Sequence, residues 1–337
     1  MNRQLITGGN FAKNSNFVFS QEITFGDFKN LNSDNLFVVS KNQDYVCYIN
    51  RNLKIEENDM VFCKTDYVNL LFKYLKKVEN LKNIKLITSQ SDLPINKKLF
   101  SRKPNCISKW YSTNVQYSNE NLISIPLGLA NEFSKKNLNQ FDFNDFTSFE
   151  DLNNKENKIY VNFNVNTNYL YRSKLISKIK KDRLFVITNN TLSLKEYKNN
   201  LSKYKFVLCP PGNGVDTHRI WETLYSNSIP IIFDEFYLDY FKELPIIAIN
   251  KVEEVVNIDF NTNKLAINQD VFFLKWWLKL IQEKTIDSNN SINIEILNHD
   301  VVRYFNLIKF KIKYLKLIKK IKTISTKFYR KIKFENL

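Results

Sequence analysis

The sequence predicts an α/β fold built from two successive Rossmann-like units that face each other across a crevice. Short apolar runs alternate with helical patterns, as in α/β proteins with parallel sheets. This pattern stops in a polar, acidic and aperiodic stretch at residues 134–158 and restarts after it. We therefore expect one α/β domain at residues 1–150, a second at 151–300, and a helical tail at 301–337.

In the first half, β-branched and aromatic residues mark the expected strands, which are residues 35–40, 44–50, 59–65, 85–89 and 122–129. An apolar stripe predicts a helix near Tyr67–Leu81. The polar residues Ser89, Asp92 and Asn114 follow the strand at 85–89. Because open α/β sheets bind ligands at the carboxyl ends of their strands, we expect these three residues to face the crevice.

The second half repeats the same alternation of strands and helices. The expected strands are residues 158–165, 183–188, 205–210 and 229–233. The expected helices are Tyr171–Lys181, Leu194–Leu201 and 217–226.

The most informative stretch is CPPGNGVDTHRIWE at residues 209–222, where a strand ends, the chain turns through glycines and a helix begins. Asp216 or Thr217 is expected to cap that helix. Such an arrangement presents backbone N–H groups and a helix dipole to an anion such as a diphosphate. Gly212 and Gly214 are two of only six glycines in the chain, which indicates close backbone approach or positive φ at this turn.

Three side chains near the start of this helix share one face, because His218 and Glu222 are four residues apart and Arg219 and Glu222 three apart. Arg219 could bind phosphate through its fork of donors. Glu222 could accept the hydroxyls of a ribose, and His218 could handle a proton near neutral pH. The alternative is a tight turn followed by an Arg–Glu pair on a solvated helix face.

Residues 204–233 as a whole resemble the signature of exostosin-like glycosyltransferases, with a weaker similarity to fucosyltransferase-like enzymes. The matching parts are Lys205-Phe206, Leu208-Cys209-Pro210, Gly212, Arg219-Ile220-Trp221-Glu222 and Ile229-Pro230-Ile231. Asn227 stands where the family commonly has glycine. The resemblance implies a GT-B fold and transfer of a sugar from a nucleoside-diphosphate sugar to a glycan or lipid-linked acceptor.

The resemblance also implies the residues of the donor site. The expected donor-binding residues are Arg172, Gly212, Asn213, Gly214, Asp216, Arg219 and Glu222. Arg172 follows the first strand of the second domain, where an arginine of resembling proteins helps to hold the diphosphate; a surface arginine is the alternative.

The expected catalytic residues are His218 and Asp92. An inverting transferase needs a group that takes the acceptor proton, and Asp92 is the candidate base from the first domain; a turn aspartate is the alternative. GT-B enzymes stabilise the leaving diphosphate with a helix dipole and basic side chains, so we expect no essential metal and no cofactor beyond the sugar nucleotide. A non-catalytic nucleotide- or glycan-binding protein on the same scaffold remains open.

Net charge is concentrated at the end of the chain. The total is +16, and residues from Arg303 onward include twelve Lys or Arg against one acid, Glu335. This argues against a nucleic-acid-binding core. The basic amphipathic tail indicates binding to an anionic membrane surface, or a helix packed on its own protein.

The cysteines and the hydropathy pattern bear on location. Cys47, Cys63, Cys106 and Cys209 have no metal-like spacing and are expected to be buried thiols. We see no signal-peptide pattern and no apolar run long enough for a spanning helix. We therefore expect a cytoplasmic protein, peripheral on the membrane if the tail binds lipid.

Overall fold

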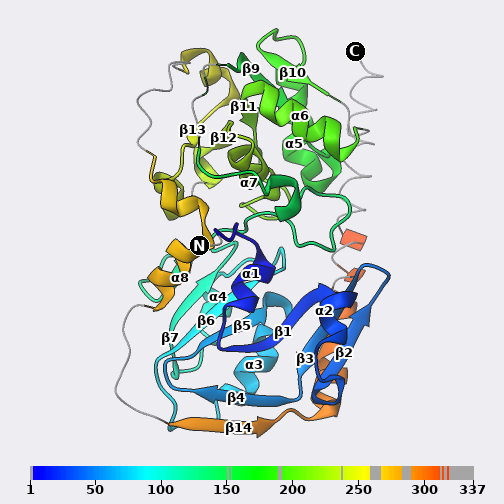
Figure 1. The fold of residues 1–337 in the computed structure, drawn as a ribbon, viewed down its shortest axis with the longest axis vertical. Helices are drawn as coiled ribbons and strands as arrows, with labels where there is room; N and C mark the ends of the chain where they lie inside the picture. Colours follow the sequence, from blue (N-terminus) through cyan, green and yellow to red (C-terminus); the bar gives the residue numbers. More distant parts are fainter. Residues whose placement is uncertain are drawn as a thin grey trace.

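The computed structural model describes residues 3–149, 152, 154–188, 192–236, 238–258, 267–282, 290–311, 313–314 and 317–318. Within these ranges the chain forms a seven-stranded, a five-stranded and a two-stranded β-sheet. Figure 1 shows the seven-stranded sheet in the lower half of the molecule and the five-stranded sheet in the upper half. The protein is thus a mixed α/β fold with two main sheets.

The seven-stranded sheet is mostly parallel, with the order β2-β3-β1-β5-β6-β7-β8. Its strands are β1 (Phe17–Thr24), β2 (Leu36–Lys41), β3 (Tyr45–Asn50), β5 (Met60–Lys64), β6 (Ile84–Ser89), β7 (Ile107–Ser112) and β8 (Leu122–Ser124). Pairing is parallel from β1 through β8, whereas β2 and β3 are antiparallel neighbours. Every residue of β5 and β6 is buried, as in strands covered on both faces.

The five-stranded sheet is parallel throughout and has the order β10-β9-β11-β12-β13. Its strands are β9 (Glu156–Val161), β10 (Phe185–Ile187), β11 (Tyr204–Leu208), β12 (Ile229–Phe233) and β13 (Ile247–Ile249). Counted within this sheet, the order is 2-1-3-4-5, a common doubly wound order. The strand order therefore reverses between β9 and β11, which is where such sheets bind ligands.

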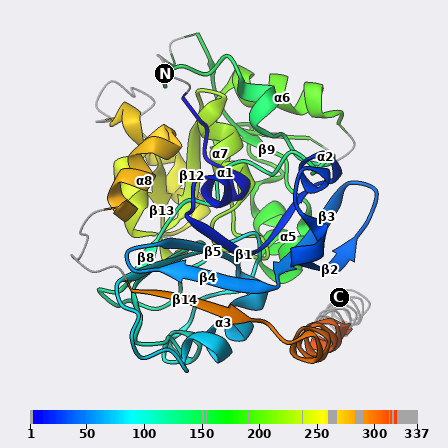
Figure 2. The same cartoon turned by 60° about the horizontal axis from the view of Figure 1, so that its bottom comes forward.

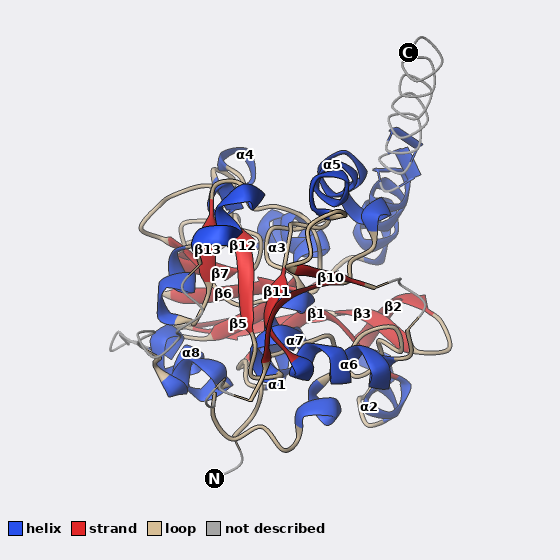
Figure 3. Cartoon of the chain, turned by 90° about the horizontal axis from the view of Figure 1, so that it is seen from above, coloured by secondary structure: helices blue, strands red, loops and turns tan. Residues whose placement is uncertain are grey.

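Helices lie on both sides of the strands, as Figure 3 shows. The α-helices are α1 (Gly8–Lys13), α2 (Phe25–Lys29), α3 (Val68–Leu75), α4 (Lys97–Phe100), α5 (Tyr169–Ile179), α6 (Leu194–Lys203), α7 (His218–Tyr225) and α8 (Leu274–Gln282). The 3₁₀ helices are η1 (Ser33–Asn35), η2 (Thr65–Tyr67), η3 (Gln140–Phe143), η4 (Val165–Asn168), η5 (Asp234–Phe236), η6 (Asp239–Glu243), η7 (Val252–Asn257) and η9 (Gln269–Phe272).

The expected elements are confirmed near their expected bounds, with three differences. The expected strand at 122–129 ends at Ser124, because Pro126 lacks an N–H for the ladder and Gly128 has φ +72°. The helix expected near Tyr67–Leu81 ends at Leu75 in a turn whose Val78 N–H bonds to Leu75 O (3.1 Å). The strands expected at 35–40 and 44–50 pair antiparallel, not parallel.

The polar stretch expected to separate the domains is anchored in the core by aromatic side chains. Phe143, Phe146 and Phe149 are buried there. The Phe146 ring lies 5.0 Å from that of Tyr225 on α7, and Phe149 stacks on Phe272 at 5.7 Å. This stretch is therefore a packed strap along the second half and not an exposed linker.

The chain returns to the first half after α8. Strand β14 (Ser291–Glu295) pairs antiparallel with β4 (Asn52–Glu56) in the two-stranded sheet, and residues 298–311 are helical. Figure 2 shows this helix nearly end-on beside β14. The second domain was expected to extend to residue 300, but β14, at 291–295, pairs with a strand of the first half.

Two further expectations concern the cysteines and the tail. All four cysteines are buried and free, as expected. Among the described residues, no helix has both the length and the apolar character needed to cross a membrane. Residues 319–337 of the expected tail lie outside the described part of the chain.

Candidate functional site

The carboxyl ends of the strands in the two main sheets meet along one boundary. Four hydrogen bonds among the described residues cross it and join loops after β6, β7 and β8 to residues 213–218. They are Asn213 Nδ2 to Asp92 Oδ2 (3.1 Å), Val215 N to Asn114 Oδ1 (3.2 Å), Leu127 N to Asp216 Oδ2 (2.7 Å) and His218 Nδ1 to Gly128 O (2.8 Å). Because open α/β sheets bind ligands beyond the carboxyl ends of their strands, this boundary is the candidate functional site.

The glycine loop between β11 and α7 is shaped by close approach. The N–H of Gly212 donates to Gly214 O at 3.0 Å, which closes a tight turn. A Cβ atom on Gly212 would lie 3.2 Å from a guanidinium nitrogen of Arg172, and one on Gly214 would lie 2.4 Å from Asn114 Oδ1. Neither glycine has positive φ, whereas Gly128 does. Lack of space, and not backbone conformation, therefore requires glycine at 214 and favours it at 212.

Arg172 on α5 holds this loop from the side of β9. Its side chain is buried and donates to the main-chain oxygens of Pro210 (2.8 Å), Pro211 (2.9 Å) and Asn164 (2.9 Å), and to Thr167 Oγ1 (2.7 Å). Burial, and then the nearby Arg219 charge, lower the pKa of Arg172 to about 10. The arginine expected to contact a diphosphate instead joins the loops after β9 and β11, at the point where strand order reverses.

The segment that leads into α7 is fixed by Asp216. This carboxylate is 2% exposed and accepts hydrogen bonds from Tyr240 Oη (2.6 Å), Trp221 Nε1 (3.1 Å) and the main-chain N–H of Leu127. Burial raises the pKa of Asp216, although these donors lower it. Asp216 therefore joins the start of α7 to the loop after β8 and to Tyr240. Thr217, and not Asp216, is the N-cap residue of α7.

Arg219 and Glu222 are linked through a tyrosine that the sequence did not indicate. Arg219 donates to Tyr197 Oη (3.1 Å), and Tyr197 donates to Glu222 Oε2 (2.8 Å). Burial raises the pKa of Tyr197 well above its ordinary value, so its hydroxyl keeps its proton and remains a donor.

Glu222, expected to accept ribose hydroxyls, is 3% exposed and also hydrogen-bonds to the main chain at Leu138. Burial raises its pKa, and the Arg219 charge opposes this shift. In this arrangement the carboxylate is occupied by protein donors, so it positions Tyr197 and, through it, Arg219.

His218 begins α7 and reaches across the boundary to Gly128. A main-chain oxygen can only accept, so Nδ1 carries the proton of this hydrogen bond. In the neutral imidazole this leaves Nε2 as a proton acceptor. Gly128 cannot be replaced easily, because a Cβ atom there would lie 2.1 Å from Ile6 O. The loop backbone thereby sets both the tautomer and the orientation of the ring.

Asp92 is exposed at the opposite side of the glycine loop, where it accepts from Asn213. The structure thus brings Asp92, Asn213, Gly214 and His218 to one boundary. Comparison with models of known protein families and with curated protein sequences finds no match. In the described part of the chain, no group of three His, Cys, Asp or Glu side chains is placed to hold a metal ion.

Sequence reasoning missed two partners in this site. Tyr197 lies within α6, whose capping box of Ser193 and Glu196 marks the start of the helix but not the role of the tyrosine. Gly128 follows β8 in a segment that was expected to be strand. No local sequence pattern marks either residue, because both act through contacts with α7. Tyr197 is 25 residues from its partner Glu222, and Gly128 is 90 residues from His218.

Proposed function

We propose that the protein is a glycosyltransferase of GT-B architecture that binds a nucleoside-diphosphate sugar between its two main sheets. The observation that carries this proposal is the meeting of the carboxyl ends of two mostly parallel sheets at the Gly212–Gly214 loop. A ligand bound there can contact residues of both halves at once, as a reaction between a donor and an acceptor requires.

The diphosphate would lie against the glycine loop and the start of α7. Loop N–H groups and the positive end of a helix dipole favour an anion, and α7 begins directly after this loop. Arg219 adds a positive charge on the first turn of that helix. The link through Tyr197 to Glu222 restrains the guanidinium, so less side-chain entropy is lost when it binds phosphate.

His218 and Asp92 are the proposed groups for proton transfer. The Nδ1–H bond to Gly128 O leaves Nε2 of His218 ready to accept a proton from an acceptor hydroxyl or to donate one to the leaving diphosphate. The Asp92 carboxylate lies on the other side of the loop, beside Asn213. Leaving-group charge would be stabilised by α7 and Arg219, and we propose that no metal is required.

We also propose that the last helix attaches the protein to an anionic membrane surface. Its first turns pack on the protein through Val301 and Tyr304, whose hydroxyl donates to Asp66 O (3.1 Å). Successive residues of an α-helix are about 100° apart around its axis. The exposed apolar side chains therefore lie on a different face from Val301 and Tyr304, and they are Val302, Leu307, Phe310, Tyr314 and Leu317. Exposed lysines flank this face, as in helices that lie on lipid headgroups.

The donor proposal is tested by incubating the full chain with a panel of UDP-, GDP- and dTDP-sugars and measuring released nucleoside diphosphate. Turnover with at least one donor is expected. Arg219→Ala should abolish it, Arg219→Lys should retain part of it, and Arg183→Ala, at an exposed arginine after α5, should leave it intact. Nucleotide binding without turnover would instead identify a non-catalytic binding protein. If neither is detected, the proposal is wrong.

A further inference from the structure

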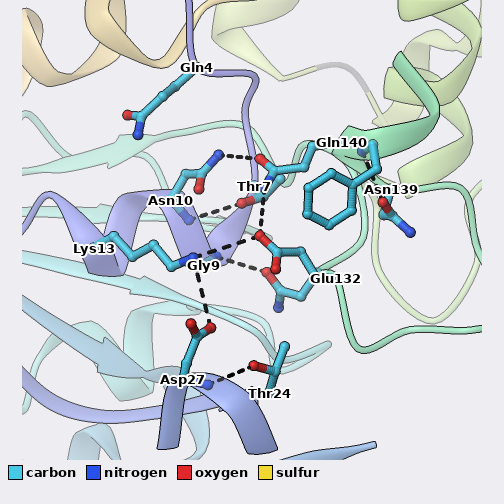
Figure 4. Close-up of polar contacts among 12 residues, drawn as sticks. Gln4, Thr7, Gly9, Asn10, Lys13, Thr24, Asp27, Glu132, Asn139 and Gln140 are labelled. Atoms are coloured by element: carbon cyan, nitrogen blue, oxygen red, sulfur yellow. Dashed lines mark hydrogen bonds and ion pairs between the residues drawn. The ribbon is translucent and has the colours of Figure 1, made fainter. Parts of the chain in front are cut away.

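A cavity lies in the first half, beside the carboxyl end of β1 and apart from the candidate functional site. Its volume is about 230 Å³, and its walls come from α1, the end of β1, α2 and residues 131–133. Figure 4 shows the Lys13 side chain of α1 directed toward Asp27 and Glu132 in this region. Drug-sized ligands occupy cavities of about 300–1,000 Å³, so this one suits a smaller molecule, of the size of a single sugar ring.

The charges that line the cavity exclude an anionic ligand. Lys13 is the one cation among the described lining residues, and it lies 3.8 Å from Asp27 and 3.7 Å from Glu132. A third carboxylate, Glu22, pairs with Lys64 at 3.3 Å. Acidic groups therefore outnumber the lining cation, and a phosphate or carboxylate would be repelled. The lining instead suits a neutral molecule or an amine.

The hydrogen-bonding groups of the lining favour a ligand rich in donors. Gln21 is buried at 8% exposure; its Nε2 donates to Tyr48 Oη (2.7 Å), while its Oε1 has no hydrogen-bond partner among the described residues. A buried acceptor left unpaired is unfavourable, so a donor supplied by a ligand would stabilise it. Carboxylate oxygens add further acceptors, and a sugar hydroxyl or an ammonium group is a donor that suits such a lining.

The cavity also has an apolar side, formed by Ile23, Leu31 and Phe133. The Phe133 ring is held in place by that of Tyr45, with centroids 5.3 Å apart. A mixture of apolar surface and a few fixed polar groups is typical of sites that bind small molecules in one orientation. A sugar ring has both kinds of surface, since its C–H groups are apolar and its edges carry hydroxyls.

Two short segments connect the surroundings of the cavity with the proposed donor site. Asn131 accepts from Gly9 N at 2.8 Å, and it follows Gly128, which binds His218, by three residues. On the other side, Gly8 packs against Ser89, three residues before Asp92. The segment after β8 therefore contributes both to the cavity wall and to the contact with His218, and the end of β6 packs against α1 beside the cavity.

We infer that this cavity binds an uncharged or amine-bearing sugar unit of the acceptor. Its identity as the acceptor site rests on the proposed glycosyltransferase function, whereas the sugar site itself does not. The first half would then select a neutral, hydroxyl-rich acceptor, while the second half holds the anionic donor. The two ligands would be distinguished by charge.

The experiment measures binding to the full chain by ligand-observed NMR, without nucleotide. The probes are glucose, galactose, N-acetylglucosamine and glucosamine, with glucuronic acid and UDP as anionic comparisons. At least one neutral or amino sugar is expected to bind, and glucuronic acid more weakly. Gln21→Met should weaken that sugar about ten-fold, as for the loss of a net hydrogen bond of about 1.4 kcal/mol. Gln116→Met, at an exposed glutamine outside the lining, should not.

A second variant tests charge and guards against loss of folding at Gln21. Asp27→Asn should lower binding of glucosamine relative to glucose, and thermal unfolding of each variant checks that it folds. Equal binding of all sugars by wild type and both variants would overturn the sugar site, as would tighter binding of glucuronic acid. If sugar binding stands while no sugar nucleotide is bound or turned over, the donor proposal fails and the sugar site survives.

Discussion

Asn114 packs directly against Gly214, so that one asparagine of the first half fixes the position of the glycine loop of the second. Its Oδ1 accepts from Val215 N (3.2 Å), and its Nδ2 donates to Ser91 O (3.2 Å). Asn114 itself has φ +55°, a conformation that asparagine tolerates better than most residues. The contact explains why a residue without a side chain is needed at 214.

Gly214→Ala should therefore weaken the contact between the two halves and destabilise the protein. The added Cβ would lie 2.4 Å from Asn114 Oδ1, and overpacking of this kind costs about 1–3 kcal/mol. The free energy of unfolding, measured in urea, should fall by that amount. Gly26→Ala is the matched control, because its Cβ would meet nothing closer than 3.7 Å. Adding Asn114→Gly, which accepts positive φ, should recover part of the loss; no recovery would show that the clash is not the cause.

His218→Asn should separate the structural from the catalytic role of the histidine. An asparagine amide can still donate to Gly128 O, but it offers no imidazole Nε2. Turnover should fall by about 10²–10⁴-fold, the usual contribution of a general acid or base, while thermal stability stays near that of wild type. His299→Asn is the control, since this second histidine is 73% exposed. Unchanged turnover in His218→Asn would leave Asp92 as the remaining candidate.

Asp216→Asn should show a characteristic dependence of stability on pH. Because burial raises the pKa of Asp216 above 3.8, the folded protein binds this proton more tightly than the unfolded chain. That contribution to stability is fully present below pH 3.8 and is lost as pH rises through the folded pKa. The difference in free energy of unfolding between wild type and variant should therefore shrink as pH rises from about 3.5 to about 7.

Urea titrations at several pH values measure this difference. Asp239→Asn, at an exposed aspartate in η6, provides the control and should show no such trend. A difference that grows with pH would mean that the hydrogen bonds from Tyr240 and Trp221 outweigh burial.

Lys309→Glu, Lys311→Glu and Lys313→Glu together should remove binding to anionic lipid. Basic residues near such a surface contribute about 1 kcal/mol each, and reversal turns this attraction into repulsion. Co-sedimentation with vesicles of phosphatidylserine and phosphatidylcholine measures the loss. The control reverses three exposed lysines near α3, Lys76, Lys77 and Lys82. Equal binding to pure phosphatidylcholine would show that charge is not required.

The sequence predicted the elements of the second half more completely than those of the first. Strand β12 is observed at 229–233 and α7 within 217–226, because a fully buried strand or an amphipathic helix shows its own local pattern. Strands β1, β4, β7 and β14 were missed, as was β13 at the edge of the second sheet. Strand β4 pairs with a segment more than 230 residues away, and no local pattern records such a partner.

The candidate site also has parts that the sequence predicted and parts that it did not. The glycine loop and His218 were predictable from residue type and spacing. The partners of Arg172 and Asp216 were not predictable. Arg172 binds loop carbonyls, and Asp216 binds Tyr240 and Trp221. In the sequence, an arginine or aspartate in a polar segment looks the same whether it binds a ligand or the protein.

The pairing of β4 with β14 also determines how the protein can be dissected. Leu53 and Ile55 on β4 are buried against a strand that is encoded after the whole second half. A fragment that stops near residue 150 would expose both side chains at an open strand edge, and such edges promote aggregation. The first half is better produced by circular permutation, with residues 290–311 joined ahead of residue 3, or by co-expression of the two segments.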